Sequence, residues 1–242
     1  MPATFESMMT LCERIRAPDQ SSLTPHWVEQ SRRLYEGTAD IFVGECGRGS
    51  IKSGWGSRVG FNEGICGDFA VPPGECHFWI DVSENMAEAR QRSLQYEQWC
   101  LMCGIPFEKR GDAIVLPELR RGFLTRAADV GRLSGFRAFG FRIDEAAKLP
   151  NDGTDPLPEL WASGTAMLVS HLKHRPKRLL LSSPLALTGF FNEMVRRGNT
   201  PDQIVAEQVP TWVANPSISE EDTHRLGGRS KLIDQLRRGR IS

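Results

Sequence analysis

A chain of 242 residues that is 40% hydrophobic and 25% charged is long enough to bury one large core, and its length allows one domain or two. Thirty basic and thirty acidic residues give zero formal charge, so composition offers no argument for a nucleic-acid partner. There is no apolar run of about eighteen residues, which excludes a transmembrane helix, and the N-terminus has no unbroken apolar core of a signal peptide. We therefore expect a soluble, cytosolic protein.

Two amphipathic helices are predicted ahead of the first strand. Apolar residues recur at helical spacing over 4–16, and Pro25 opens a second helix that Gly37 ends. Helices placed before the first strand can cover the base of a nucleotide, so Gln30 is a candidate adenine contact. The alternative is a solvated glutamine on a helix surface, which is the commoner role of such a residue.

A short apolar run, a glycine-rich turn and a Lys-Ser pair follow. Residues 40–43 are the predicted first strand, and the turn leads into Lys52 and Ser53. This layout is typical of a P-loop, in which backbone N–H groups surround a phosphate, a lysine contacts the β- and γ-phosphates and a hydroxyl holds Mg²⁺. The pattern G-x-x-x-x-G-K-[ST] asks for glycine at two positions where this chain has Cys46 and Ile51. Taken alone, a glycine-rich surface loop that contains a lysine is an equal alternative.

The middle of the chain alternates predicted strands and helices. Residues 77–81 form the second strand, and Ser83 is a candidate N-cap for a long helix over 84–103. Residues 113–116 and 122–125 look like short strands in a hairpin-like excursion.

Six cysteines raise the question of a metal site. Cys100 and Cys103 form a C-x-x-C pair, for which Cys66, Cys76 or His77 are the available further ligands. The spacing fits no zinc pattern well, so buried free thiols are the favoured interpretation. The cytosolic interpretation also argues against disulfides.

A further strand ends in two adjacent carboxylates, Asp144 and Glu145. In a P-loop enzyme the aspartate of such a pair holds the Mg²⁺ shell, and the glutamate polarises the water that attacks the γ-phosphate. The alternative is an acidic pair that caps the following helix. The order of glycine-rich turn, Lys-Ser, a second strand and then a strand ending in Asp-Glu is typical of an additional-strand, catalytic-glutamate P-loop ATPase.

The remaining elements complete an α/β pattern. A helix is predicted over 156–174, then an apolar strand that ends at Ser182, Ser183 and Pro184, where a polar side chain can sense the γ-phosphate. A helix over 190–197, a last strand and a short C-terminal helix follow. The pattern predicts a three-layer α/β domain with a mostly parallel central sheet and nucleotide bound at the carboxyl ends of the strands.

Four motifs together resemble the ATPase domain of tailed-bacteriophage large terminase subunits, the motors that drive viral DNA into the procapsid. The matching stretches, in the family's order, are Gly47–Ser53 as the P-loop, Ile143–Ala147 as Walker B, Leu181–Pro184 as the coupling motif, and Thr211–Pro216 before Ile218–Glu221. The resemblance covers about residues 24–226.

The resemblance implies a P-loop ATPase domain over residues 1–226, with N-terminal helices in 1–39 and a core in 40–215. Residues 227–242 would be a C-terminal linker or tail. The family normally continues into an RNase H-like nuclease with clustered metal-binding aspartates. Because the chain ends before such a domain, we expect no nuclease activity from it.

The resemblance also implies a role for each matching residue. Lys52 would contact the phosphates, and Ser53 and Asp144 the magnesium ion. Glu145 would be the catalytic carboxylate, and Ser183 would couple hydrolysis to movement.

Within the loop, Arg48 would sense nucleotide in cis. The rest of the loop that would surround the phosphates comprises Gly47, Gly49, Ser50 and Ile51. We expect the β-branched side chain of Ile51 to crowd the phosphate or to hold the loop in another shape. The family supplies a further arginine from a neighbouring subunit, for which Arg132 is the first candidate and Arg137 the second. The alternative for either is an exposed surface charge.

The function implied by the resemblance is Mg²⁺-dependent ATP hydrolysis coupled to packaging of double-stranded DNA. The implied partners are that DNA, the portal protein and the small terminase subunit, with the subunits forming a head-to-tail ring at the procapsid in the host cytoplasm. An isolated monomer would then be a poor ATPase. Two alternatives remain: a P-loop scaffold with impaired turnover that binds DNA or portal, and a helicase-like remodeller. The lack of further helicase motifs after residue 184 argues against the second.

Overall fold

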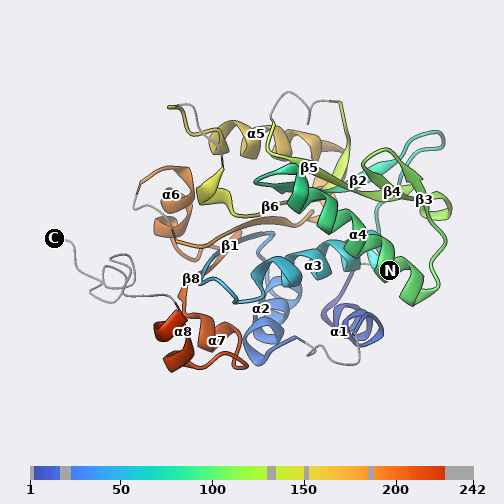
Figure 1. The fold of residues 1–242 in the computed structure, drawn as a ribbon. Coiled ribbons are helices and arrows are strands. Elements are labelled where there is room, and N and C mark those ends of the chain that lie inside the picture. The colour runs from blue at the N-terminus through green and yellow to red at the C-terminus, as the bar shows by residue number, and fades with distance from the viewer. Residues whose placement is uncertain (1–2, 17–22, 130–134, 150–152, 185–187, 227–242) are drawn as a thin grey trace.

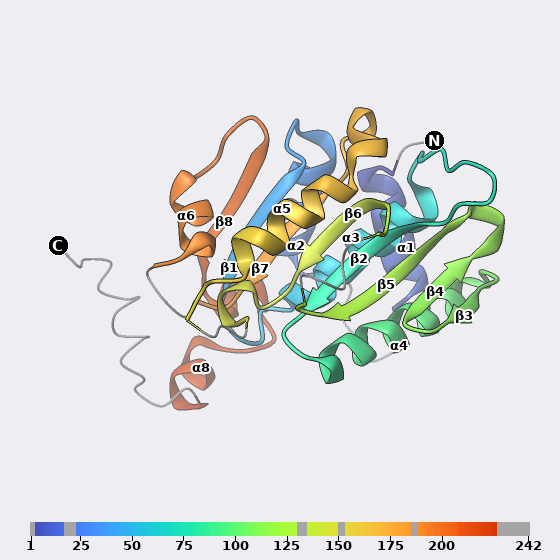
Figure 2. The same ribbon diagram turned by 90° about the horizontal axis from the view of Figure 1, so that it is seen from above.

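The computed structural model describes residues 3–16, 23–129, 135–149, 153–184 and 188–226. Across these residues an eight-stranded sheet runs through the centre and carries helices on both faces (Figure 1, Figure 2). The predicted three-layer α/β architecture is confirmed. None of the helices in these ranges is long and apolar enough to span a membrane.

The sheet is mostly parallel. Its strands are β1 (Ile41–Cys46), β2 (His77–Ser83), β3 (Glu108–Arg110), β4 (Ala113–Leu116), β5 (Arg121–Ala127), β6 (Ala138–Ile143), β7 (Arg178–Ser182) and β8 (Gln203–Val209). They lie in the order β3-β4-β5-β2-β6-β7-β1-β8, and only the β3–β4 and β4–β5 pairs are antiparallel. Strand β7 is inserted between β1 and β6, which is the arrangement expected of an additional-strand P-loop domain. The carboxyl ends of β1, β2, β6 and β7 therefore meet at one edge of the sheet.

Each face of the sheet has its own hydrophobic cluster. One face packs against α1 (Phe5–Arg14), α2 (Pro25–Glu36), α3 (Lys52–Cys66) and α4 (Met86–Cys103). The other packs against α5 (Leu157–Met167), the 3₁₀ helix η4 (Val169–His174) and α6 (Phe190–Arg197). Successive side chains of a strand point to opposite faces, so in β1 Ile41 and Val43 join the second cluster and Phe42 joins the first. The short helices α7 (Thr211–Ala214) and α8 (Glu220–Leu226) follow β8, and α7 packs against α2.

Helix α3 lies close to the sheet because it presents glycines to it. A Cβ atom built at Gly56 would lie 2.7 Å from Cδ of Arg142 on β6, and one at Gly60 would meet the indole of Trp79 on β2. A larger residue at either position would separate the helix from the strands. The close approach fixes the N-terminus of α3, and Lys52 with it, beside the carboxyl edge of the sheet.

Several predicted boundaries are corrected. The helix predicted from residue 84 begins at Met86, because the side chain of Asn85 accepts the Glu88 N–H at 3.0 Å and caps it, whereas Ser83 is the last residue of β2. The single helix predicted over 156–174 is divided at Leu168 into α5 and η4. Strand β3, with three residues, and helix α7, with four, were not predicted, because such short segments show no hydrophobic periodicity.

Candidate functional site

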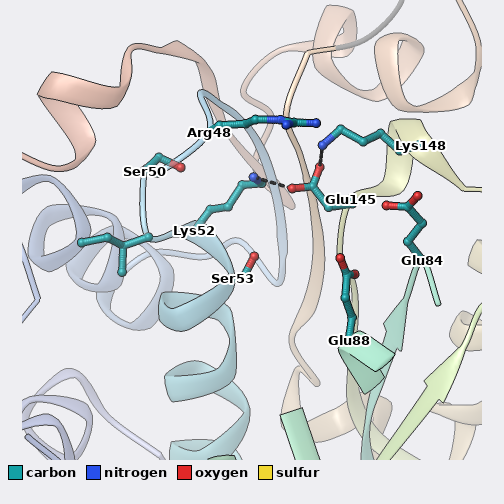
Figure 3. Close-up of a pocket in the computed structure, with 10 residues that line it drawn as sticks. Arg48, Ser50, Lys52, Ser53, Glu84, Glu88, Glu145 and Lys148 are labelled. Atoms are coloured by element: carbon teal, nitrogen blue, oxygen red, sulfur yellow. Dashed lines mark ion pairs between the residues drawn. The ribbon is translucent and has the colours of Figure 1, made fainter. Parts of the chain in front are cut away.

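A cavity of about 440 Å³ opens at the carboxyl edge of the sheet (Figure 3). Arg48 and Lys52 line one side, and Glu84, Glu88 and Glu145 together with Lys148 line the other. Its lining consists of Arg48, Gly49, Ser50, Ile51, Lys52, Ser53, Glu84, Glu88, Glu145 and Lys148. The glycine-rich loop and the first turn of α3 thus form one wall, while the residues after β2 and β6 form the wall facing it.

The loop between β1 and α3 is a compact turn with two residues in the left-handed region. Gly49 has φ +81°, and Ile51 has φ 65° and ψ 10°. Such a backbone costs a residue other than glycine about 1–2 kcal/mol, and more for a β-branched one. Ile51 is nonetheless the N-cap residue of α3, and its side chain packs against the first hydrophobic cluster. Ile51 therefore adopts a left-handed conformation that a glycine would adopt without this cost.

Lys52 is buried and directed at the end of β6. Its Nζ lies 2.8 Å from Oε1 of Glu145 and donates to Oγ of Ser183 at 3.0 Å. The three residues come from α3, from the turn after β6 and from the end of β7, so the inserted position of β7 is what brings Ser183 here. The predicted loop lysine, acidic residue and strand-end serine therefore share one hydrogen-bonded cluster.

Glu145 is held as an ionised carboxylate. It stands in the left-handed region at φ 49°, and Lys148 Nζ lies 2.6 Å from its Oε2. Ser183 donates its backbone N–H to Oε2 at 3.2 Å. Burial opposes ionisation, but the charge of Lys52 and the hydrogen bonds from Lys148, Lys52 and Ser183 outweigh it and lower the pKa of Glu145 to about 2. At neutral pH this group accepts hydrogen bonds and is a weak base.

Asp144 is buried beneath the cavity. Its carboxylate accepts the N–H of Glu145 at 3.2 Å, and Arg92 of α4 lies 3.5 Å from Oδ2. Arg142 of β6 ties this strand to α3, because its Nη1 donates to the Ser53 carbonyl. Its Nε also lies 2.8 Å from Asp81 of β2, in a fully buried ion pair.

The oxygen donors near the cavity suit Mg²⁺. Ser53, Glu84 and Glu88 line it, and Asp144 directly follows β6. No group of three or more His, Cys, Asp or Glu residues in the described ranges is arranged to hold a metal ion by itself. Mg²⁺ is commonly held by one or two carboxylates together with waters and substrate phosphates, and such an arrangement needs no complete cage of side chains.

Three lining residues were not predicted. Glu84 directly follows β2, and the pKa of Glu88 is raised by burial and by the neighbouring charges of Glu84, Asp144 and Glu145. Lys148 lies one turn after Glu145 in the short 3₁₀ helix η3 (Ala146–Lys148). The position of Glu84 at a strand's carboxyl end was the available signal.

Of the sequence candidates in the described ranges, Gly47, Asp144 and Ser183 lie next to lining residues without lining the cavity themselves, whereas Gln30 and Arg137 lie elsewhere. Gln30 is buried on α2, where its Oε1 accepts from Arg33 at 2.9 Å, and it does not line the cavity. Arg137 precedes β6 at the opposite edge of the sheet and lies 3.4 Å from Glu75. Arg132 lies outside the described residues. The adenine contact and the arginine acting on a neighbouring subunit stay predictions.

The histidine considered as a zinc ligand belongs to a different cluster. His77 bonds to His171 through Nδ1 at 2.6 Å and to Glu75 through Nε2 at 2.8 Å, at the amino edge of the sheet. All six cysteines are free thiols; Cys12, Cys46 and Cys100 are buried, as predicted, whereas Cys66, Cys76 and Cys103 are only half-buried. Burial raises the pKa of each of the three buried thiols.

This histidine pair predicts loss of stability in acid. Burial, followed by the charges of His77 and His174, lowers the pKa of His171 from 6.5 to about 4. Between pH 6.5 and 4, His171 is therefore protonated in the unfolded chain and neutral in the folded chain. The free energy of unfolding should fall as the pH drops from 6.5 toward 4. Urea denaturation across this range should show a shallower pH dependence for His171→Gln. The control His224→Gln should keep the pH dependence of wild type. If His171→Gln also kept it, His171 would not be the group that destabilises the protein in acid.

Solved structures of bacteriophage large terminases share this fold. The ATPase domain of the Thermus phage P74-26 large terminase is similar with a TM-score of 0.66 at 15% identity, over 98% of this chain and 97% of that one. The HK97 bacteriophage large terminase gives a TM-score of 0.66 at 14% identity, over 95% of this chain and 53% of that one. The large terminase of the thermophilic bacteriophage D6E, solved in complex with ADP, gives 0.55 at 13% identity, over 91% of this chain and 48% of that one.

The chain thus spans about half the length of the HK97 and D6E proteins and nearly all of the P74-26 domain. Comparison by sequence with family models and with curated proteins gives no match. At these identities the likeness establishes the fold, which is the one that the four sequence motifs predicted: the P-loop fold of a large terminase ATPase domain.

Proposed function

We propose that this chain is the ATP-hydrolysing motor domain of a viral large terminase and that the cavity binds ATP with Mg²⁺. The observation that carries the proposal is the convergence of Lys52, Glu145 and Ser183 beside a glycine-rich loop, within 3.4 Å of one another. The large terminase of phage D6E binds ADP, which supports nucleotide as the ligand.

The cationic wall would bind the phosphates. The backbone N–H groups of the loop and of the first turn of α3 face an anion favourably, and Lys52 adds a full positive charge. To contact the phosphates, Lys52 has to leave Glu145. Arg48 lines the same wall, where it would sense the phosphates.

Glu145 would then orient the attacking water. Once Lys52 has moved, Lys148 and the Ser183 N–H would still contact this carboxylate and favour its ionised form, so that it would accept a hydrogen bond from water. Ser53 and Asp144 would hold Mg²⁺, which when bound neutralises charge on the phosphates.

Ser183 would couple hydrolysis to movement. In the structure Lys52 donates to its hydroxyl, which lies 3.4 Å from Oε1 of Glu145. Once Lys52 moves to a phosphate, that hydroxyl loses one partner and keeps the other. The end of β7 would therefore experience a change of hydrogen bonding that follows the presence of the γ-phosphate.

The finer assignments extend the same proposal. Hydrolysis would be coupled to packaging of double-stranded DNA by a head-to-tail ring on the portal, in contact with the small terminase subunit. A neighbouring subunit would supply an arginine, with Arg132 as the first candidate. The P-loop ATPase domain would extend over residues 1–226, followed by a linker.

Binding and turnover test this proposal separately. The purified full chain is expected to bind fluorescent ATP saturably and only with Mg²⁺, and to hydrolyse ATP faster when portal and double-stranded DNA are added. Binding without any turnover in the assembled system would favour the scaffold alternative. Strand separation by the isolated chain would favour the helicase-like one, and absence of binding would contradict both the motor and the nucleotide site.

Replacement of Ile51 by glycine is expected to change the Kd for Mg²⁺-ATP by less than about threefold. The loop already has the left-handed conformation in the absence of nucleotide, so the strain is present in the free and the bound states and cancels in binding. Fluorescence titration of wild type, Ile51→Gly and the β-branched control Ile51→Val measures this. A tenfold or greater gain in affinity with glycine would show that Ile51 crowds the phosphate.

A further inference from the structure

Three consecutive carbonyl groups of the loop are each bonded from outside the cavity. Thr211 Oγ1 donates to the Arg48 carbonyl at 2.7 Å, and Asn215 Nδ2 donates to the Gly49 carbonyl at 2.9 Å. The Trp27 indole Nε1 donates to the Ser50 carbonyl at 2.6 Å. The donors come from α2 and from α7 with its C-cap, which are far from the loop in sequence.

The three donors form one rigid support. Thr24, the N-cap residue of α2, donates its hydroxyl to the Ala214 carbonyl at 2.6 Å, which ties α2 to α7. Trp27 is fully buried and stacks on Trp55 of α3 with ring centroids 4.8 Å apart. Thr211 also packs directly on the loop, because a Cβ at Gly47 would lie 2.5 Å from its Oγ1. Gly47 is thus needed for contact with α7, independently of any phosphate.

These bonds decide where the loop's N–H groups point. In a trans peptide the C=O of one residue and the N–H of the next lie in one plane and point in opposite directions. Bonding the carbonyls of residues 48 to 50 on the outside therefore turns the N–H groups of Gly49, Ser50 and Ile51 toward the inside. Ser50 uses its N–H for a turn bond to the Gly47 carbonyl at 3.3 Å. The N–H groups of Gly49 and Ile51 have no partner anywhere in the described ranges.

The same bonds oppose the strain in the loop. A left-handed isoleucine at position 51 persists only where the surroundings over-determine the backbone. The support donates one hydrogen bond to each carbonyl of residues 48, 49 and 50. Each such bond favours this loop conformation over others by a few-fold in the equilibrium constant.

We propose that Trp27, Thr211 and Asn215 are positioning residues that hold the loop open for a phosphate group and so set the affinity for a nucleoside triphosphate. This rests on the proposed function of the cavity. The affinity for nucleotide would then also depend on α7, a segment that follows the last strand and does not line the cavity. A displacement of α7 would release two of the three carbonyls at once.

Substitutions that remove one donor without changing charge test the proposal. Thr211→Val and Asn215→Ala should each raise the Kd for fluorescent Mg²⁺-ATP about five- to tenfold. Thr211→Ser keeps the hydroxyl and should therefore keep the wild-type Kd. Thr38→Val is the matched control, since it also removes a threonine hydroxyl that donates to a distant carbonyl, that of Pro201 at 2.7 Å, but ahead of β1 and away from the loop. It should leave the Kd within about twofold.

Hydrogen exchange of the loop gives a readout that needs no nucleotide. Without ligand, the amides of residues 47–53 should exchange faster in Thr211→Val and Asn215→Ala than in wild type or Thr38→Val. Wild-type exchange and Kd in both loop variants would overturn the proposal, and so would equal changes in Thr38→Val. If wild type binds no nucleotide, the proposed function fails, and exchange alone decides whether these residues position the loop.

Discussion

Replacing Glu145 by glutamine is expected to lower the rate of ATP hydrolysis by about 10²–10⁴-fold, while Mg²⁺-ATP binds more tightly than to wild type. The rate falls because a neutral amide orients the attacking water less well than a carboxylate. Binding tightens because Lys52, which now lies 2.8 Å from Oε1 of Glu145, no longer has to leave a negative charge to reach the phosphates. Single-turnover hydrolysis in the assembled system, together with a binding titration, separates these two effects.

The control for this substitution is Glu75→Gln. Glu75 also carries an ion pair, 3.4 Å from Arg137, but at the opposite edge of the sheet. It should leave both hydrolysis and binding at the wild-type level. Hydrolysis by Glu145→Gln at the wild-type rate would show that another group orients the water and would withdraw the catalytic role from this residue.

Replacing Lys52 by alanine is expected to raise the Kd for Mg²⁺-ATP at least about a hundredfold, because a buried charge that faces the phosphates is lost. The fold should survive, since Glu145 keeps Lys148 at 2.6 Å and the Ser183 N–H at 3.2 Å. Titration with fluorescent ATP measures the effect, with circular dichroism as the check on folding.

Lys109→Ala is the matched control, because Lys109 also pairs with a glutamate, Glu97, but on the surface of the molecule. It should bind nucleotide like wild type. Equal binding by wild type and Lys52→Ala would mean that the loop does not contact phosphate, and would favour the alternative of a scaffold without nucleotide turnover.

The strands and the three-layer architecture were readable from sequence because each carries a local signal. The apolar runs before Gly47 and before Asp144, and the run that ends at Ser182, are all buried strands. Their parallel order then follows from the alternation with helices. Short elements such as β3 and α7 have no such signal.

Only some of the residues of the candidate site could be predicted from the sequence. Lys52, Glu145 and Ser183 were predicted because each belongs to a motif at a strand end or a helix start. Glu84 and Glu88 were missed. The place of Glu84 directly after a strand was a signal, but the approach of both residues to the cavity also depends on β2 lying next to β6, which no local pattern encodes.

The conformation of the loop also could not be predicted. The left-handed backbone of Ile51 contradicts the preference of a β-branched residue, and the side chains that hold it come from elsewhere. Thr211 and Asn215 lie more than 160 residues from the carbonyls that they bond. Long-range side-chain-to-backbone bonds of this kind leave no trace in the spacing of a sequence.

Binding of Mg²⁺-ATP to the cavity through this loop is tested most directly by a structure of the full chain with a non-hydrolysable ATP analogue and Mg²⁺. We expect the phosphates to lie against the loop, Lys52 to have moved from Glu145 to a phosphate oxygen, and Ser53 and Asp144 to lie beside the metal ion. The bonds from Thr211 and Asn215 to the loop carbonyls should be unchanged. An analogue bound elsewhere, or a loop that carries no phosphate while Lys52 stays on Glu145, would contradict this mode of binding.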